Sequence, residues 1–301
     1  MADLPLRGAD DALYVIDISG WIHRCLHALP PAVSPTGEPC NATGGVIGML
    51  VRLLKDRDPG FLAVAFDRPG RTFRHDLFPG YKAARPARPP ELDIQSRRVR
   101  EIFEAHRIPI LESEGFEADD CIAAATARAL DAGLRVVIVA LDKDLLQLVG
   151  DRVVCWDGRS RDATGPAEVT ARFGVGPALL GDLLALAGDS SDGIPGVPGV
   201  GVKTAATLLQ KRGSLADVLR KADWVPQPAL RAKLRVHADD ARLSRQLVEL
   251  RADAPIAFDP AELRVGGYDV ARLRAIYGEL GFTRLAAEVQ SIPKRPWRGS
   301  E

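Results

Sequence analysis

Short apolar runs alternate with helical segments along the first half of the chain. The apolar runs are four to seven residues long, which is the length of buried strands rather than of helices. The segments between them carry apolar residues at helical spacing, and the Ala-rich one ends at Gly133, a common helix stop. This alternation predicts an α/β fold with a mostly parallel central sheet flanked by helices. The expected strands are 13–18, 61–66, 108–111, 135–141 and 151–156, and the expected helices are 43–54, 97–106 and 119–132.

The second half of the chain has a different pattern, because Pro and Gly now separate short helical segments. This pattern predicts a smaller, all-α C-terminal region. We expect an α/β core over residues 1–163, a helical region over 164–290 and a flexible, polar tail over 291–301. The expected helices are 166–173, 177–187, 203–210, 228–236 and a last pair near 269–290.

The composition is that of an ordinary soluble protein, with 46% hydrophobic and 27% charged residues among 301. No apolar run reaches the roughly 18 residues that span a bilayer. The N-terminus lacks the apolar core and cleavage site of a secretory signal, so we expect a cytoplasmic protein with no membrane contact. The cysteines have no metal-ligand spacing and are expected to be reduced thiols. They are Cys25, Cys40, Cys121 and Cys155.

Charge is balanced over the whole chain but unevenly distributed. Lys plus Arg and Asp plus Glu each number 40, so the formal net charge is zero. Residues 68–90 nevertheless hold six basic residues and a single acid, Asp76, whereas acids cluster elsewhere. A basic stripe beside an acidic pocket is what a metal-dependent enzyme acting on nucleic acid requires.

The acids fall where strands end or helices begin. Asp17 and Asp67 end the first two expected strands, and a third pair follows the fourth strand. In open parallel sheets, ligands bind beyond the carboxyl ends of the strands, so these side chains are expected to face one rim. Any single one of them has an alternative role as a helix cap or as a charge complementing a helix dipole. The nine acids, in five places, are Asp17, Asp67, Glu117, Asp119, Asp120, Asp142, Asp144, Asp189 and Asp192.

Acid doublets such as Asp142 and Asp144 are costly to place together unless cations neutralise them. Hard oxygen ligands in such number favour Mg²⁺ or Mn²⁺ over zinc. Two such ions about 4 Å apart activate water and stabilise the leaving oxygen of a phosphoryl displacement. No Ser-His-Asp arrangement competes with this interpretation.

Residues 194–205 (IPGVPGVGVKTA) form a glycine-rich segment that leads into an expected helix. Bare backbone at these glycines lets N–H groups approach phosphates, and a helix N-terminus favours anions. The pattern is typical of a helix-hairpin-helix and lacks the GK[ST] end of a nucleotide-binding loop. A plain Gly/Pro turn between helices is the alternative. The residues expected to bind DNA here are Gly196, Gly199, Gly201, Lys203 and Thr204.

Residues 71–90 (RTFRHDLFPGYKAARPARPP) interleave basic side chains with Phe73, Phe78 and Tyr81. Positive charge with aromatic stacking holds single strands without sequence preference, so this segment is a candidate for that role. A solvated, flexible basic loop is the alternative.

Four motifs together resemble those of the 5′-nuclease domain of bacterial DNA polymerase I and its free-standing relatives, the flap endonuclease family. They are FRHDLFPGYKAARP (73–86), GFEADD (115–120), LDKDLLQLV (141–149) and GDSSDGIPGVPGVGVKTA (188–205). The resemblance runs from about residue 12 to about residue 290. It implies a PIN-like, 5′-nuclease-like α/β core, and the absence of a polymerase segment leads us to expect the free-standing form.

The resemblance also implies a role for each site residue. The first metal ion would be held by Asp17, Asp67, Glu117 and Asp119. The second would be held by Asp120, Asp142, Asp144, Asp189 and Asp192. A basic arch over about 71–90 would admit the free 5′ strand, with Lys82 and Arg85 stabilising the transition state and Arg71, Arg74 and Tyr81 also contacting DNA. A hairpin over about 188–211 would grip duplex DNA, with K⁺ held by backbone carbonyls.

The implied enzyme is a 5′-3′ exonuclease and flap endonuclease of replication and repair. It would use two Mg²⁺ ions, with Mn²⁺ as a substitute, and leave 5′-phosphate and 3′-hydroxyl ends. Its expected partners are DNA with a 5′ flap or 5′ end, RNA–DNA primers and a separate DNA polymerase. We expect a monomer associated with the bacterial nucleoid.

Three positions depart from the family pattern without removing an acid. Asp17 is followed by Ile18-Ser19-Gly20 instead of Gly-Ser-Ser, His23 stands where a base-stacking Tyr is common, and Gly193 replaces a usual Asn. Two alternatives stay open: a catalytically silent module that binds branched DNA, and a related single-strand ribonuclease. The ribonuclease group usually lacks the hairpin, so residues 188–205 argue against it.

Overall fold

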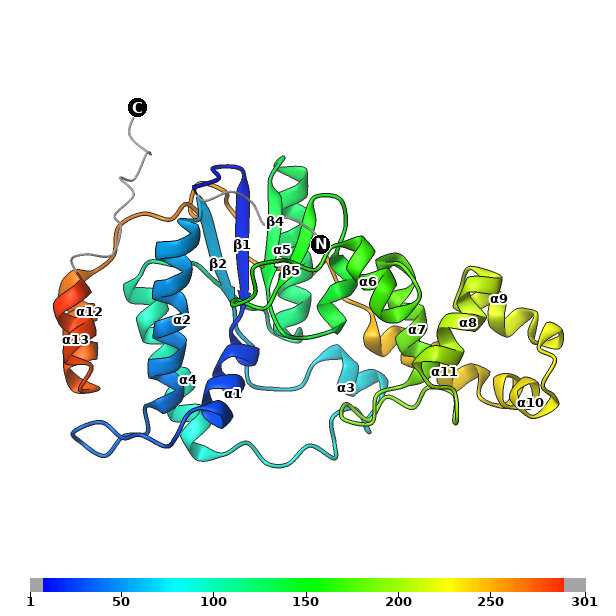
Figure 1. The fold of residues 1–301 in the computed structure, drawn as a ribbon. Helices are drawn as coiled ribbons and strands as arrows, with labels where there is room; N and C mark the ends of the chain where they lie inside the picture. The colour runs from blue at the N-terminus through cyan, green and yellow to red at the C-terminus, as the bar shows by residue number, and fades with distance from the viewer. Residues whose placement is uncertain (1–7, 290–301) are drawn as a thin grey trace.

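The computed structural model describes residues 8–289. At its centre lies a parallel sheet of five strands in the order β3-β2-β1-β4-β5 (Figure 1). Every expected apolar run contributes one strand, so the mostly parallel sheet is confirmed. The strands are β1 (Ala12–Asp17), β2 (Phe61–Ala65), β3 (Ile110–Leu111), β4 (Arg135–Val139) and β5 (Val153–Trp156).

Strand β1 lies in the middle of the sheet and is buried on both faces. Leu13 and Val15 belong to the apolar cluster that includes helix α5, whereas Tyr14 and Ile16 belong to the cluster on the opposite face. This alternation follows from the two-residue period of a strand. The helices that cover the two faces are α1 (Ile18–Ala28), α2 (Asn41–Arg57) and α4 (Pro90–Ala105) on one, and α5 (Ala118–Asp131) on the other.

The strand order reverses direction at β1. From β1 the chain moves through β2 to β3 on one side, whereas β4 and β5 lie on the other side. Such a reversal opens a crevice beyond the carboxyl ends of the strands that flank it. Asp17 ends β1, and Asp142 follows β4 by three residues, so both carboxylates lie beside this crevice.

The helical region packs onto the core through helix α7, which is largely buried. It contacts α8 and α11, and its apolar residues share one cluster with α5 and β1, so the two regions have a continuous core. Short 3₁₀ helices η1 (Asp144–Leu148), η2 (Pro177–Leu179) and η3 (Ala222–Trp224) connect the longer elements. The helices are α6 (Pro166–Phe173), α7 (Leu180–Ala187), α8 (Val202–Arg212), α9 (Leu215–Arg220), α10 (Pro228–Val236) and α11 (Ala238–Val248).

The last two helices return to the α/β core. Helices α12 (Val270–Glu279) and α13 (Thr283–Glu288) lie on the opposite side of the molecule from α8 to α10 (Figure 1). Leu273 and Tyr277 of α12 pack against Ile47 of α2 and Ile102 of α4. These two helices therefore belong spatially with the core, although the sequence groups them with the helical region.

Helices α1, α3 (Phe73–Leu77), α9 and α11 were not expected from the sequence. Helix α1 starts directly after β1 with no intervening turn residues, so its start carries no Gly or Pro signal. Within residues 8–289 no single helix is long and apolar enough to cross a bilayer, although the bent pair Pro166–Phe173 and Pro177–Ala187 meets that length and composition together. The tail expected at 291–301 lies outside the described residues.

Candidate active site

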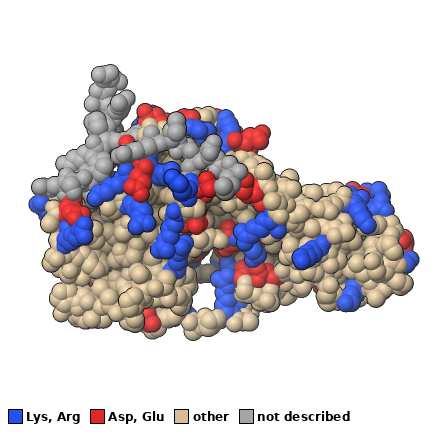
Figure 2. Space-filling model, in the orientation of Figure 1, with Lys and Arg blue, Asp and Glu red and all other residues tan. Residues whose placement is uncertain are grey.

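A cleft of about 1140 Å³ opens beyond the carboxyl ends of β1, β2 and β4. Carboxylates from separate parts of the sequence line it together with several arginines and Lys82. Figure 2 shows Lys and Arg side chains gathered around the hollow between the core and the helical region. Five of the nine predicted acids line the cleft: Asp17, Asp67, Glu117, Asp119 and Asp142.

Asp17 is a buried carboxylate that also begins helix α1. Its Oδ1 accepts a hydrogen bond from the Gly20 N–H at 3.3 Å, so it is the N-cap of the helix. A Cβ atom at Gly20 would lie 2.6 Å from Asp17 Oδ2. The glycine that departs from the family pattern thus leaves room for the carboxylate in this position.

Asp67 links the ends of β1 and β2 to helix α5. Its Oδ2 accepts a 2.6 Å hydrogen bond from Ser19, and its Oδ1 accepts a 2.9 Å hydrogen bond from the Ala118 N–H. These two donors fix the carboxylate beside Asp17 and Asp119, which line the same cleft.

Two of the cleft carboxylates, Asp17 and Asp119, have a raised pKa. Burial, with the nearby charges of Asp67 and Asp142, raises the pKa of Asp17 to about 7. Burial and the charges of Asp142, Asp17 and Asp67 raise the pKa of Asp119 well above its usual value. Among the described residues, no Lys or Arg forms an ion pair with any of these four acids. Within residues 8–289 these acids are therefore close enough to repel one another, and no direct ion pair neutralises them.

This donor set fits a hard divalent cation, because it consists of oxygen ligands whose repulsion a cation would relieve. Within residues 8–289, no three His, Cys, Asp or Glu side chains are already gathered tightly enough to form a metal-ligand cluster. The carboxylates share one cleft without forming a closed set of ligands in the part of the chain that the structure describes.

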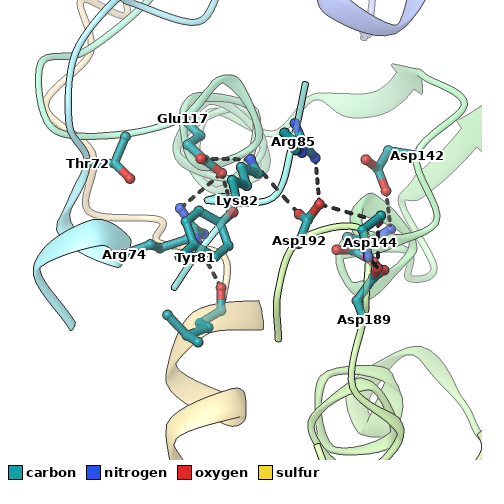
Figure 3. A network of polar contacts seen from close by, with 12 residues as sticks. Thr72, Arg74, Tyr81, Lys82, Arg85, Glu117, Asp142, Asp144, Asp189 and Asp192 are labelled. Atoms are coloured by element: carbon teal, nitrogen blue, oxygen red, sulfur yellow. Dashed lines mark hydrogen bonds and ion pairs between the residues drawn. The ribbon is translucent and has the colours of Figure 1, made fainter. Parts of the chain in front are cut away.

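Glu117 occupies a different electrostatic setting. Its Oε1 accepts a 2.8 Å hydrogen bond from Lys82 Nζ and its Oε2 accepts a 2.9 Å hydrogen bond from the Tyr81 hydroxyl (Figure 3). Arg74 lies 3.6 Å from Oε2. Glu117 therefore connects the cleft to the basic segment 71–90.

The expectation that Asp120 holds a metal ion and that Arg74 contacts DNA is corrected by the structure. The two side chains are almost fully buried and form a bidentate ion pair, with N–O distances of 2.6 and 2.8 Å. Asp120 also accepts hydrogen bonds from the N–H groups of Glu117 and Arg251. Arg74 donates to the carbonyls of Leu247 and Glu249. The pair thus holds α3, α5 and the end of α11 together, and the capping alternative is right for Asp120.

Tyr81 is likewise unavailable to DNA, because its side chain is only 3% exposed and its hydroxyl donates to Glu117. Phe73 packs against Phe116 and beneath the guanidinium of Arg251, and Phe78 packs partly buried on the main core. The interleaved aromatics therefore attach the segment to the protein. Of the three, Tyr81 has its ring buried, whereas Phe73 and Phe78 stay partly exposed, so base stacking by these two stays a prediction.

The remaining basic residues of this segment border the acids or the solvent. Arg71 is exposed and pairs with Asp76 at 3.3 Å. The backbone N–H of Lys82 donates to the Asp192 carbonyl at 2.8 Å, and Arg85 lies 2.5 Å from the Asp192 carboxylate. Residues 80–85 form the base of the arch, and they contact residues 189–193, which we call the acidic loop. Figure 3 shows Lys82 and Arg85 beside Asp192 of this loop.

Gly193 allows the backbone at Gly80 to approach the acidic loop closely. Its φ is +70°, and a Cβ atom there would lie 2.5 Å from the Gly80 carbonyl oxygen. The departure from the usual Asn therefore has a physical consequence, since it lets the backbone of the arch base approach the acidic loop.

Four of the acids expected at the second metal ion lie outside the main cleft lining: Asp120, which pairs with Arg74, and Asp144, Asp189 and Asp192. Burial and the charge of Asp142 raise the pKa of Asp144 to about 6. Burial alone would raise the pKa of Asp189, but hydrogen bonds from Lys143 and Ser191 outweigh it and lower that pKa to about 2.

The hairpin residues differ in their access to a ligand. Gly196 is buried, its N–H donates to Ser244 Oγ, and a Cβ there would lie 2.4 Å from the Gly188 nitrogen. Gly196 is thus required for packing, which corrects its assignment to DNA binding. Gly199, Gly201 and Lys203 are exposed beside the N-terminus of α8, and Thr204 is partly exposed.

His23 lies on α1 at the cleft wall, and its ring stacks at 6.2 Å from that of His27. Burial and nearby Arg88 lower its pKa. Sequence reasoning missed several basic cleft residues because they lie on α1 and α4, outside the basic stretch 68–90. They are Arg24, Arg97 and Arg100.

Two family models match the chain in succession. The 5′-3′ exonuclease N-terminal resolvase-like domain matches residues 12–174, and the 5′-3′ exonuclease C-terminal SAM fold matches residues 175–271. The chain belongs to the 5′-3′ exonuclease family. The predicted family, and a nuclease as the predicted kind of enzyme, are thereby confirmed.

Relatives of this 5′-3′ exonuclease family member include a 5′-3′ exonuclease of Aquifex aeolicus, 37% identical over 93% of this chain and 96% of that protein. DNA polymerase I of Rhizobium leguminosarum is 41% identical over 93% of this chain, which spans only 28% of the polymerase. Among solved structures, a bacteriophage T5 flap endonuclease in complex with DNA and metal ions has a TM-score of 0.65 at 20% identity, over 93% of this chain and 98% of the other. That likeness supports the PIN-like fold.

Proposed function

We propose that this family member is a structure-selective 5′-3′ exonuclease and flap endonuclease that hydrolyses DNA phosphodiesters. The observation that carries the proposal is the convergence of Asp17, Asp67, Glu117, Asp119 and Asp142 on one cleft beside the basic arch. A scissile phosphate in this cleft would meet both a carboxylate-lined floor and the positive charge of Lys82 and Arg85. Hydrolysis would leave a 5′-phosphate and a 3′-hydroxyl.

Two Mg²⁺ ions, with Mn²⁺ as a substitute, are the proposed cofactors. Asp17, Asp67, Glu117 and Asp119 would hold the first, and Asp142, Asp144, Asp189 and Asp192 the second. Bound ions would activate water and neutralise charge on the leaving oxygen. Asp120 is left out of both sets because Arg74 occupies its two oxygens.

The chain's own residues would orient and stabilise the reacting phosphate. Ser19 and the Ala118 N–H fix the Asp67 carboxylate, which gives its free lone pairs a defined direction. Lys82 pairs with Glu117 at the edge of the cleft, where its ammonium would lie next to the phosphate. Preorganised charge of this kind stabilises the transition state without reorganisation during the reaction.

Duplex DNA would lie along the hairpin, with phosphates near Gly199, Gly201, Lys203 and Thr204 at the N-terminus of α8. A K⁺ ion held by hairpin carbonyls is part of this proposal, as is a 5′ strand passing the arch at Arg71 and Arg85. His23 at the cleft wall is the proposed stacking partner for a terminal base. The proposed division is a nuclease core over 1–163, which α12 and α13 complete, and a DNA-binding region from 164 to the end of α11.

The natural substrate would be a 5′ flap, a 5′ end or an RNA–DNA primer during replication and repair. We further propose that the protein acts as a monomer in the bacterial cytoplasm at the nucleoid, together with a separate DNA polymerase. The test is cleavage of a 5′-flap duplex with Mg²⁺ by the protein and by Asp142→Ala. The proposal requires cleavage that the variant loses, whereas tight flap binding without turnover would favour a catalytically silent module.

A further inference from the structure

Lys143 lies between two acids that the proposed function assigns to the second metal ion. Its Nζ is 2.6 Å from Asp189 Oδ2 and 3.6 Å from Asp144 Oδ1. Asp144 begins η1, whereas Asp189 lies in the segment after α7, and Figure 3 shows the two residues next to each other. One ammonium group therefore neutralises part of the charge on both.

The surroundings fix each carboxylate so that one oxygen is left for a cation. Ser191 donates two hydrogen bonds to Asp189 Oδ1, from its N–H at 2.9 Å and from its hydroxyl at 2.6 Å, so Oδ2 faces Lys143. Asp144 Oδ1 is buried and has no hydrogen-bond partner in the described part of the chain. It lies within electrostatic reach of Lys143 but too far for a hydrogen bond.

The two sets of acids differ in their protein counter-ions. Among the described residues, Asp17, Asp67 and Asp119 of the first set and Asp142 of the second have no Lys or Arg within ion-pair distance, whereas Glu117 of the first set pairs with Lys82 and Arg74. Asp144 and Asp189 share Lys143, and Asp192 pairs with Arg85. A divalent ion entering the second set would therefore meet an ammonium already bound to the oxygens that it needs. An ion entering the first set would meet such a cation only at Glu117, because Asp17, Asp67 and Asp119 form no ion pair within residues 8–289.

We propose that Lys143 is a built-in counter-cation that holds Asp144 and Asp189 together and competes with the second divalent ion for their oxygens. This inference rests on the proposed function of the acids. Before a metal ion binds, the lysine offsets the repulsion between the two carboxylates. When a metal ion binds there, the ammonium must move away from Asp189, so the affinity of the second site is lower than the carboxylates alone would give.

The test counts Mn²⁺ sites without DNA, by titrating Mn²⁺ and following the electron paramagnetic resonance signal of the free ion. Lys143→Met removes the charge while keeping an unbranched side chain, and Lys143→Arg keeps the charge. Lys55→Met is the matched control, since Lys55 lies on α2 and pairs only loosely with Glu288, at 3.9 Å. Urea unfolding of each variant establishes that it is folded, and Lys143→Gln replaces the Met variant if the latter is not.

The expected result is a weaker Mn²⁺ site that tightens at least about tenfold in Lys143→Met, because a nearby like charge has gone. The tighter site should stay within about twofold, and Lys143→Arg and Lys55→Met should match the unmodified protein. An unchanged weaker site in Lys143→Met would overturn the inference, as would loss of that site. Flap cleavage measured in parallel separates the two proposals. If the unmodified protein cleaves but the weaker Mn²⁺ site is unchanged in Lys143→Met, only the role of Lys143 is refuted. If the protein neither cleaves nor binds Mn²⁺, the proposed function and this inference are refuted together.

Discussion

Lys82 Nζ lies 2.8 Å from Glu117 Oε1, so the basic arch is tied by an ion pair to the first residue before helix α5. The same lysine has a φ of +54° and donates its backbone N–H to Asp192, which holds its side chain at the cleft edge. Two independent anchors on one residue indicate a positioned cation rather than a freely moving surface charge.

Lys82→Ala should slow flap cleavage much more than it weakens duplex binding. The Lys82 ammonium lies beside the cleft, whereas duplex DNA is expected on the hairpin. Removing the ammonium should therefore destabilise the transition state more than it weakens duplex binding. Single-turnover rates at saturating DNA should fall about 100-fold, with the dissociation constant for a flap duplex changed less than about threefold. Equal losses in rate and in affinity would mean that Lys82 is only a phosphate anchor.

Arg74→Leu should lower the free energy of unfolding by about 3–5 kcal/mol, because it leaves Asp120 buried without its partner. Urea titration should show a smaller loss for the double variant Arg74→Leu/Asp120→Leu, in which no lone charge remains. Asp120→Asn should leave Mn²⁺ affinity unchanged, since the carboxylate faces Arg74. Weakened Mn²⁺ binding in a folded Asp120→Asn protein would restore this residue to the metal site.

Gly193→Asn should push the base of the arch away from the acidic loop, because the new Cβ would meet the Gly80 carbonyl at 2.5 Å. Cleavage by trypsin after Lys82 should become faster. Gly213→Asn is the control, since Gly213 has a φ of +83° and no atom within 4 Å of an added Cβ. Equal trypsin sensitivity of the two variants would show that the close approach at Gly193 has no effect on the arch.

Stability should fall in acid through His106, whose burial lowers its pKa to about 4. The unfolded chain binds this proton near pH 6.5, so between about 6.5 and 4 it carries more protons than the folded one. The free energy of unfolding should therefore drop as pH falls through that window, by up to roughly 3 kcal/mol. In urea titrations, the free energy of unfolding should depend less on pH in His106→Gln than in the unmodified protein, whereas the exposed His27→Gln should match the unmodified protein. The same pH dependence in all three proteins would contradict the role of His106.

Much of the fold follows from local patterns. All five strands lie in short apolar runs, and the strand-end acids converge as parallel topology requires. Helix α1 was not predicted because β1 leads directly into it. Asp17 ends β1, caps α1 and also lines the cleft. Local sequence gives no signal for such a dual role.

The errors at the site have one physical origin. Arg74, Tyr81 and Asp120 have the residue types of a DNA interface or a metal site, yet each is buried by contacts with segments far away in the sequence. The partners that bury Arg74, at Leu247 and Glu249, are more than 170 positions away. Residue type alone cannot separate a charge that faces solvent from one that is paired inside.

The central claim is that the cleft acids support metal-dependent hydrolysis, and Asp119 tests it most directly because this acid lines the cleft and forms no ion pair within the described residues. The measurement is the single-turnover rate of 5′-flap cleavage with Mg²⁺ for the unmodified protein, for Asp119→Asn and for Asp131→Asn, an exposed acid on the same helix. We predict a loss of at least about 100-fold for Asp119→Asn, with DNA binding retained and Asp131→Asn unaffected. Cleavage by Asp119→Asn at the unmodified rate, or no Mg²⁺-dependent cleavage by any of the three, would contradict the account.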